Sequence, residues 1–288
     1  MSPCSFIMGF EIQAHRGARA FFPENTLQAF FKAADLGIRV IELDLVVSAD
    51  MQIVVSHDPW LCGPLCLDPD GEPLDDGDHS RIIYEMPYSG IAAYDCGRPH
   101  PSFPAQQQVR SSKPLLKDVF SGVDARIAAS GLEGKMVFNL EIKSWPGKEG
   151  VYHPDPSSYA RLVLDTVSTA GFGDRVRIQS FDYRVVREAW KVDPGLCYGL
   201  LVNEREHTFP FLDELGFVPG YLNPRYDMAD REMIAKLHEK GIRVIPWTVN
   251  RPEDMLEMKN LGADGLITDY PEMALGLAGL VVQGPVQH

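Results

Sequence analysis

Short apolar segments alternate with segments of helical periodicity along most of this chain of 288 residues. Such alternation is typical of a parallel sheet, because each parallel connection needs a crossover of a dozen or more residues. Eight apolar runs bounded by polar residues or glycine predict strands at residues 11–15, 40–44, 136–143, 176–181, 197–202, 220–223, 244–249 and 265–268. Eight strands with intervening helices make a (β/α)8 barrel, and chains of this length can fold as one such domain. We therefore predict an α/β protein with a single TIM-barrel domain over residues 1–288.

Helices are predicted between most of these strands. In the first helix, Leu27, Phe30, Phe31 and Ala34 recur at helical spacing, and Gly37 ends the segment. The clearest helical patterns span residues 26–36, 159–170, 183–191, 230–240 and 253–261.

One segment breaks the alternation. Residues 45–47 and 53–56 both resemble strands, but only a few residues around Asp50 separate them. This connection is too short for a parallel crossover, so we predict an antiparallel hairpin that extends the second strand. The hairpin would bring His57 back opposite Asp44.

Three carboxylates are predicted to meet at the carboxyl ends of two strands. Side chains alternate along a strand, so Glu42 and Asp44 share one face, as do Glu141 and Lys143. Three carboxylates at about 4 Å would repel one another by about 4 kcal/mol per pair at an effective dielectric near 20. Ion pairs would relieve this, but only Arg16 and Lys143 are obvious partners. We therefore predict a divalent cation, and all-oxygen ligands suit Mg²⁺ or Ca²⁺ better than zinc.

Two histidines could move protons beside that cation. A single histidine is more often a surface or core residue than a catalyst. However, Arg16 follows His15 directly, and the hairpin returns His57 to the carboxylates. We interpret His15 and His57 as a general acid–base pair. Arg16 and Lys143 could serve only as counter-charges, but we favour contacts to a phosphate.

Four other residues allow more than one interpretation. Phe181 and Trp247 stand at strand ends and fit the core or a substrate-lining surface equally well. Thr26 is expected to cap the helix that follows it, and the role of Asn25 stays open.

The charge balance constrains the partner. The chain has 40 acidic and 27 basic residues, a net charge of −13, which argues against nucleic acid or an anionic membrane as main partner. An anionic substrate must therefore be attracted by local cations. The chain contains no run of 18 apolar residues, so no membrane span is predicted. No basic residue precedes Arg16, so the first residues do not resemble an export signal.

The cysteines are few and scattered, and their number is odd. We expect free thiols and a cytoplasmic protein of unknown oligomeric state, because disulfides are rare in the reducing cytoplasm. The five cysteines are Cys4, Cys62, Cys66, Cys96 and Cys197.

Several short motifs occur together in one order. They are His15-Arg16-Gly17, Pro23-Glu24-Asn25-Thr26, Glu42-Leu43-Asp44, His57-Asp58 and Leu140-Glu141-Ile142-Lys143. In type and order these motifs resemble those of the glycerophosphodiester phosphodiesterase family. The resemblance continues through Ser180-Phe181, Trp247-Thr248-Val249-Asn250 and Gly265-Leu266-Ile267-Thr268-Asp269, so it covers nearly the whole chain.

The resemblance implies a reaction and a set of roles. It implies metal-dependent hydrolysis of a small glycerophosphodiester to glycerol 3-phosphate and an alcohol such as choline or ethanolamine. It places the metal on Glu42, Asp44 and Glu141, and it implies attack by a substrate hydroxyl through a cyclic phosphate. Such intramolecular attack gains proximity, with effective molarities that reach ~10⁵ M. The sequence does not say which histidine is base and which acid; we favour His15 as base and His57 as acid.

Residues 58–114 form a long irregular segment after the second strand, rich in Pro, Gly and Asp. Long irregular segments within a compact domain usually form lids or binding loops. The resembling family has an insertion here, so we expect this segment to cap the barrel mouth and select the substrate. The tail after Leu275 is expected to be a frayed end.

Two other functions are alternatives for this sequence. A lipid-cleaving barrel of the sphingomyelinase D type would act at a membrane, and the acidic charge and missing export signal count against it. A binding domain without activity would be expected to lack part of the site. Both histidines and all three carboxylates are present, so the sequence does not favour that function.

Overall fold

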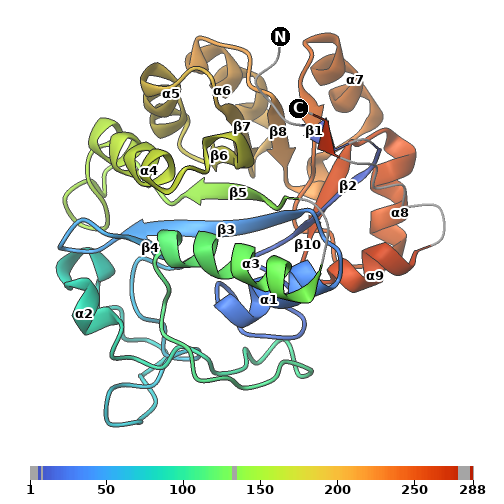
Figure 1. Cartoon of the computed structure of the whole chain (residues 1–288). Coiled ribbons are helices and arrows are strands. Elements are labelled where there is room, and N and C mark those ends of the chain that lie inside the picture. The colour runs from blue at the N-terminus through green and yellow to red at the C-terminus, as the bar shows by residue number, and fades with distance from the viewer. Residues whose placement is uncertain (1–5, 8, 132–134, 278–285, 288) are drawn as a thin grey trace.

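The computed structural model describes residues 6–7, 9–131, 135–277 and 286–287. Its main sheet contains eight parallel strands in the order β10-β2-β3-β5-β6-β7-β8-β9, with helices around them (Figure 1). Between β9 and β10 the backbone is joined by hydrogen bonds from Asp264 N to Val244 O at 2.9 Å and from Ile267 N to Pro246 O at 2.9 Å. The predicted barrel is therefore confirmed, and it is nearly closed.

All eight predicted strands are present. They are β2 (Glu11–Ala14), β3 (Val40–Val47), β5 (Val137–Ile142), β6 (Val176–Ser180), β7 (Cys197–Val202), β8 (Tyr221–Pro224), β9 (Arg243–Val244) and β10 (Gly265–Thr268). The strand β9 is shorter than predicted, and Pro246 has no N–H with which to continue a regular ladder. A separate pair, β1 (Phe6–Ile7) and β11 (Val286–Gln287), is antiparallel. The expected frayed tail is therefore wrong for residues 286–287.

The five predicted helices are also confirmed, with ends shifted by up to three residues. The helices are α1 (Leu27–Asp35), α2 (Tyr88–Ile91), α3 (Leu116–Ser130), α4 (Pro156–Ala170), α5 (Tyr183–Val192), α6 (Thr208–Leu215), α7 (Arg231–Glu239), α8 (Pro252–Leu261) and α9 (Pro271–Gly276). Thr26 caps α1 as expected, because its Oγ1 accepts a hydrogen bond from Ala29 N at 3.2 Å. Short 3-10 turns lie at Ile83–Glu85, Gly173–Arg175, Arg205–His207 and Tyr226–Met228.

The predicted hairpin is confirmed as well. The strand β4 (Ile53–Val55) pairs antiparallel with β3, with Leu45 opposite Val55. The pairing continues past β4, where Ser56 N donates to Asp44 O at 3.0 Å, so Ser56 and not, as predicted, His57 stands opposite Asp44. One face of the hairpin joins the barrel core, and the other packs against residues of the following segment.

Residues 58–114 have a small core of their own. Leu61, Leu65, Ile83 and Ile91 are buried together against the hairpin. A disulfide joins Cys66 to Cys96 within this segment, whereas Cys62 is a free thiol. The expectation of free thiols is therefore wrong for this pair, and also for Cys197, which is disulfide-bonded. The spacing of 30 residues gave no sign of it, and the folded segment brings the two Cα atoms to 3.9 Å.

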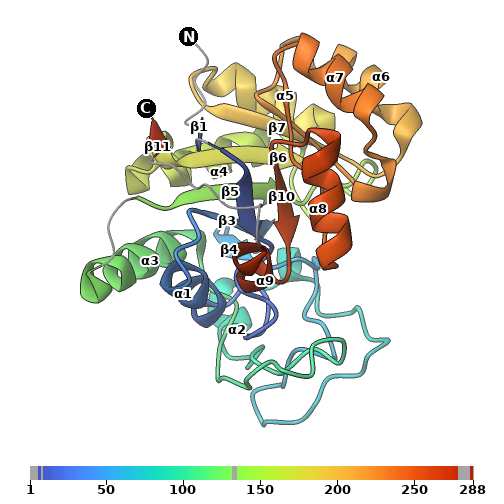
Figure 2. The same cartoon turned by 90° about the vertical axis from the view of Figure 1, so that its right-hand side faces the viewer.

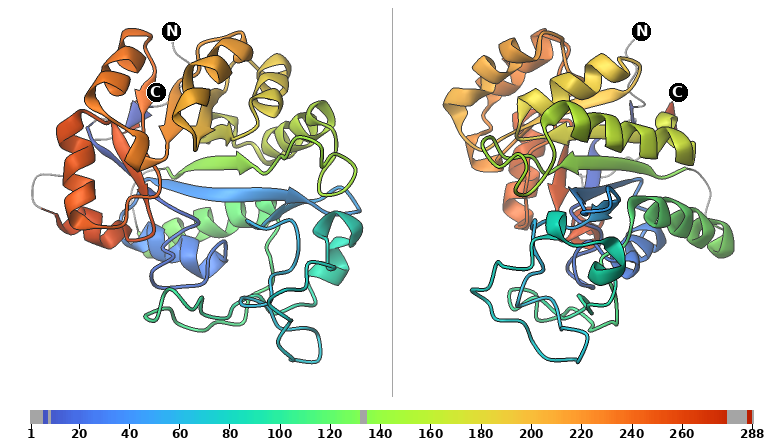
Figure 3. Two further views of the ribbon diagram at one scale, coloured as in Figure 1. Left: turned by 180° about the vertical axis from the view of Figure 1, so that it is seen from behind. Right: turned by 90° about the vertical axis from the view of Figure 1, so that its left-hand side faces the viewer.

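The segment lies beside the barrel, below α1 and α9 in Figure 2, and both views of Figure 3 show it on that side. It contacts the loop after β2, where Gln106 Nε2 donates to Arg19 O at 2.6 Å and Gln107 N to Phe21 O at 2.8 Å. The ring of Phe103 also lies near that of Tyr270, with centroids 6.0 Å apart. These contacts place the segment along one edge of the barrel opening. Its role as a cap stays a prediction.

Candidate active site

The carboxyl ends of the strands surround a cavity of about 80 Å³. Every predicted site residue except Asp44 lines it, and Asp44 is buried beside Glu42 with 1% of its surface exposed. The lining residues are His15, Arg16, Glu42, His57, Glu141, Lys143, Gln179, Phe181, Leu201, Trp247, Thr248 and Ile267. The fold therefore brings together residues that lie far apart in the sequence. Of residues 58–114, all of which the structure describes, none lines this cavity.

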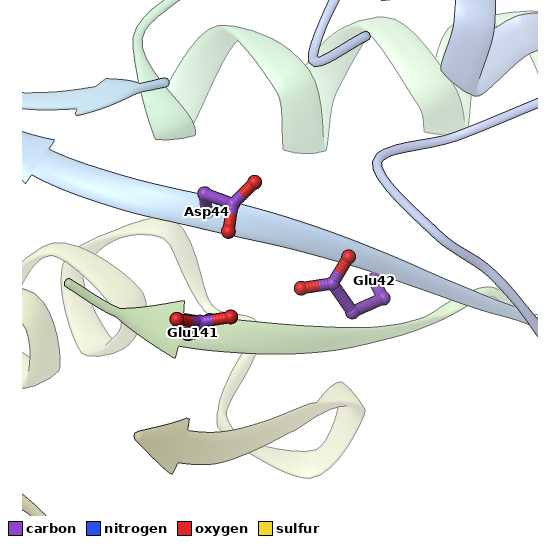
Figure 4. A group of neighbouring side chains, drawn as sticks. All are labelled: Glu42, Asp44 and Glu141. Atoms are coloured by element: carbon purple, nitrogen blue, oxygen red, sulfur yellow. The ribbon is translucent and has the colours of Figure 1, made fainter. Parts of the chain in front are cut away.

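The three carboxylates come from two neighbouring strands. Glu42 and Asp44 stand two residues apart on β3, and Asp44 is paired in register with Glu141 on β5. One oxygen from each of the three groups lies within 4.8 Å of the others (Figure 4). All three side chains are buried, so little water can separate their charges.

The donor set fits a hard divalent cation. All three groups offer oxygen atoms, which Mg²⁺ and Ca²⁺ prefer. Within the described part of the chain, Asp44 Oδ1 accepts no hydrogen bond, and its nearest cation is Lys143 Nζ at 3.2 Å. The other oxygen of Asp44 accepts a hydrogen bond from Asn25 Nδ2 at 2.8 Å, which holds the carboxylate in place. Asn25, whose role the sequence left open, therefore positions a predicted metal ligand.

The electrostatics of the cluster point the same way. Burial, followed by the charges of Asp44 and Glu141, raises the pKa of Glu42 well above its ordinary value. Burial alone would also raise the pKa of Asp44, but Lys143 and Arg16 hold it well below its usual range. Lys143 Nζ lies 2.7 Å from Glu141 Oε1. One more positive charge would relieve the repulsion that acts on Glu42.

The loop after β2 is folded tightly around Arg16. Its backbone N donates to Glu42 Oε2 at 3.0 Å, and its guanidinium lies 2.9 Å from Glu24 and 3.3 Å from Asp44. Arg16 and Asn25 both have positive φ, at 56° and 57°, which is uncommon for residues other than glycine. Such strained backbone is often found at functional sites.

Gly17 explains part of the first motif. Its φ is +86°, and a Cβ there would lie 2.8 Å from backbone and side-chain atoms of Ala29 on α1. Only glycine fits between the loop and the helix, so this residue allows Arg16 to sit over the carboxylates.

His15 is oriented by Asp269 and Asn250, which belong to motifs of the resemblance but received no predicted role. Its Nδ1 lies 2.7 Å from Asp269 Oδ1, and Asn250 Nδ2 donates to Asp269 Oδ2 at 2.7 Å. Burial lowers the pKa of His15, and the charge of Asp269 opposes that shift. Asp269 follows β10, the neighbour of β2, so its place at a strand end was the signal that could have identified it.

His57 has a more open setting. Its Nδ1 lies 2.9 Å from Asp58 Oδ1, and the side chains of His57 and Asp58 are 33% and 30% exposed. The hairpin thus places this histidine at the cavity with Glu42 and Glu141, as its geometry predicted. Each histidine has an aspartate at Nδ1, and Nε2 of His15 also accepts a hydrogen bond from Arg16 Nε at 3.3 Å.

Two aromatic side chains form another part of the cavity wall. Phe181 follows β6, and Trp247 lies three residues after β9. Their rings meet edge to face, with centroids 5.3 Å apart, and the indole Nε1 of Trp247 donates to Asn223 O at 2.9 Å. Both line the cavity, which agrees with the substrate-lining alternative.

Comparison with known proteins agrees with this geometry. A profile of the glycerophosphoryl diester phosphodiesterase family matches residues 15–273. A glycerophosphodiester phosphodiesterase from Caldanaerobacter subterraneus subsp. tengcongensis is 29% identical over 269 residues, which are 92% of this chain and 96% of that protein.

Solved structures share the barrel. One from Silicibacter pomeroyi, described as a proposed glycerophosphoryl diester phosphodiesterase, is 29% identical with a TM-score of 0.82, over 92% of this chain and 91% of that one. A phosphodiesterase from Oleispira antarctica, solved with its product sn-glycerol-3-phosphate, is 23% identical with a TM-score of 0.73, over 92% and 94% of the two chains. The profile match spans most of the sequence and includes the entire cavity wall. The chain therefore belongs to the glycerophosphoryl diester phosphodiesterase family.

Proposed function

We propose that this enzyme hydrolyses glycerophosphodiesters to glycerol 3-phosphate and an alcohol, with His15 and His57 as its general base and general acid. One observation carries the proposal: both histidines line one small cavity together with Glu42, Glu141 and two cationic side chains. A phosphodiester needs its charge neutralised, its nucleophile deprotonated and its leaving oxygen protonated. This cavity contains a group for each task.

Glu42, Asp44 and Glu141 would hold a Mg²⁺ or Ca²⁺ ion. When bound, that ion supplies positive charge to the phosphate oxygens and orients the substrate. Lys143 and Arg16 add positive charge at the same cavity, which offsets the net negative charge of the protein.

His15 is arranged to accept a proton. If its Nδ1 donates to Asp269, its Nε2 is an acceptor, and Arg16 Nε lies 3.3 Å from that atom in a donating geometry. In the proposed first step, His15 Nε2 removes the proton from a hydroxyl of the substrate glycerol. The hydroxyl oxygen forms a new bond to phosphorus, and the bond from phosphorus to the leaving alcohol breaks. The product of this step is a cyclic phosphate.

His57 completes the cycle. It donates its Nε2 proton to the oxygen of the leaving alcohol, while Asp58 holds Nδ1. In the second step, neutral His57 accepts a proton from water, which opens the cyclic phosphate. Protonated His15 returns its proton to the glycerol oxygen, so both histidines regain their starting state. Phe181 and Trp247 would contact the glycerol carbons across the cavity.

The test is turnover of glycerophosphodiesters with different head groups, with and without EDTA. Release of glycerol 3-phosphate that stops with EDTA and resumes with excess Mg²⁺ or Ca²⁺ would support the proposal. A cyclic phosphate that appears and disappears in ³¹P spectra would support the two-step route. Inability to cleave any diester in the panel would overturn the proposed function.

The proposed partner is a small-molecule substrate. The Oleispira antarctica phosphodiesterase, which has the same fold, was solved with the small product sn-glycerol-3-phosphate, and this supports the proposal. In the part of the chain that the structure describes, no helix has the length and apolar character needed to cross a bilayer.

We also propose a cytoplasmic location, although disulfides are rare there. Alkylation of thiols before cell lysis tests it. A reduced Cys66–Cys96 pair would agree, and an oxidised pair would not.

A further inference from the structure

Three aromatic rings meet at the barrel opening, outside the cavity already described. Trp60 lies three residues after His57, and Trp145 lies two residues after Lys143. The ring of Tyr152 contacts both: its centroid is 5.8 Å from that of Trp60 at an interplanar angle of 63°, and 6.0 Å from that of Trp145 at 78°. We call Trp60, Trp145 and Tyr152 the aromatic corner. It joins the start of residues 58–114 to the β5–α4 loop.

The corner is held in place by two histidines. The ring of His79 stacks on Trp60, with centroids 4.1 Å apart and 21° between planes. His153 is fully buried, and its Nε2 accepts a hydrogen bond from Trp145 N at 2.9 Å. Because its other nitrogen lies 2.7 Å from Pro154 O, His153 fixes the loop that carries Trp145 and Tyr152. The rings are therefore preorganised before any ligand arrives.

Core packing does not account for these rings. All three are only partly buried, and none belongs to a hydrophobic cluster formed by the described residues. The face of Tyr152 already attracts a cation, because Lys148 Nζ lies 5.5 Å from its ring centroid. Asp58 stands two residues before Trp60 in the chain, and its side chain, which pairs with His57, is 30% exposed. Aromatic faces beside a carboxylate are the surroundings that quaternary ammonium groups prefer.

We propose that the aromatic corner binds a quaternary ammonium head group on the leaving alcohol, so that choline diesters are the preferred substrates. This inference rests on the proposed function and names its substrate class. In the proposed reaction His57 donates its proton to the leaving oxygen, so the head group leaves on the His57 side. Trp60 follows His57 by three residues, which connects the aromatic corner to that side of the cavity. Phe181 and Trp247 then face the glycerol.

The decisive comparison uses two substrates that differ by one atom. One is glycerophosphocholine, and the other carries a tert-butyl group in place of trimethylammonium, which keeps the shape and removes the charge. We expect kcat/KM to favour the choline diester by about 3- to 30-fold, as cation–π contacts at partly exposed sites would give. Equal rates for the two diesters would overturn the inference.

Variants locate the effect. Trp60→Leu and Tyr152→Leu should bring the ratio toward one, and Trp60→Phe should keep part of it because a ring face remains. Lys148→Met should raise the ratio, since it removes a competing cation. The matched control is Lys236→Met, an exposed lysine on α7, which should leave the ratio unchanged. A ratio that survives both Trp60→Leu and Tyr152→Leu would place choline recognition elsewhere.

A binding measurement separates this inference from the proposed function. Choline chloride should quench the tryptophan fluorescence of the wild type, and 3,3-dimethylbutanol should not. Tyr152→Leu keeps all four tryptophans of the chain, so its loss of quenching would assign choline to the corner. If no diester were hydrolysed but choline still bound, the proposed reaction would fail and the corner would stand. If diesters were hydrolysed but choline did not quench, the inference about the corner would be wrong.

Discussion

His15 and His57 line the same cavity, but they are held there by different parts of the structure. His15 follows a barrel strand, is 13% exposed, and contacts Asp269 from the neighbouring strand end. His57 follows a hairpin that extends out of the barrel, is 33% exposed, and contacts Asp58, the next residue in the chain. The support of His15 joins distant segments, whereas that of His57 is local. In the proposed mechanism, the base is therefore held by the barrel itself, and the acid is held by the hairpin and the residue that follows it.

The largest effect is expected from removal of the metal ion, on which both histidines would depend. If both histidines act on one phosphate held by a metal ion, chelation should abolish activity, and Mg²⁺ or Ca²⁺ should restore it. Glu141→Gln should raise the metal concentration needed, because it removes one charged ligand. Activity measured against free metal concentration checks this, with Glu188→Gln on α5 as a control. Full activity in excess chelator would leave the carboxylates without the proposed role.

Loss of either imidazole should come next. His15→Ala and His57→Ala should each lower kcat by at least about 10²-fold, as expected for general acid–base groups. Folding, followed by circular dichroism, and metal binding, followed by calorimetry, should largely survive. A near-normal rate in one variant would remove that histidine from the mechanism.

The aspartates distinguish the two supports. Asp269→Asn should lower kcat/KM by about 10- to 100-fold, in the range of orienting groups, and Asp58→Asn should have a smaller effect. The sign of the pH effect also follows. The charge of Asp269 raises the pKa of His15, so its removal lowers that pKa and moves the acidic limb of the rate profile to lower pH.

A pH–rate profile of each variant measures this shift. Asp58→Asn should leave the limb that belongs to His15 in place. Equal losses in the two variants would show that the supports do not differ in the way described here.

The smallest effect is expected from the disulfide of residues 58–114. A disulfide that closes a loop of about 30 residues contributes about 3–4 kcal/mol in the chain-entropy model. Replacing both Cys66 and Cys96 by Ser should loosen the segment and change relative rates among choline, ethanolamine and inositol diesters. The rate with bis(p-nitrophenyl) phosphate, which lacks such a head group, should change less. If all substrates lost rate equally, the segment would belong to the catalytic machinery.

The barrel with its site and residues 58–114 were not equally predictable from the sequence. The period of the apolar residues fixes strands and amphipathic helices, and alternation on β3 and β5 places Glu42, Asp44 and Glu141 on shared faces. Asp269 was missed because its role depends on which strand ends lie side by side, a property of barrel closure rather than of local pattern. The helices α3 and α6 were not among the strongest patterns either. In α6, Phe209, Phe211 and Leu212 are partly buried around several faces, so no single stripe stands out.

Residues 58–114 were the least predictable part. Their core depends on contacts between short irregular stretches, such as the bridges of Leu67 with Pro73 and Asp95. No periodicity marks such contacts. The cysteine pairing and the aromatic corner result from that packing, so neither could be read from spacing.

The β3–β4 hairpin has a consequence for how this sequence can vary. Val46 and Val54 face the core of residues 58–114, whereas Leu45 and Val55 face the barrel core. A deletion or insertion of one residue within the hairpin would exchange these faces and turn His57 away from the cavity. Length variation should therefore be tolerated only after Asp58. Among natural relatives, the number of residues between the positions of Asp44 and His57 should therefore be constant, whereas the length of the segment after Asp58 should vary.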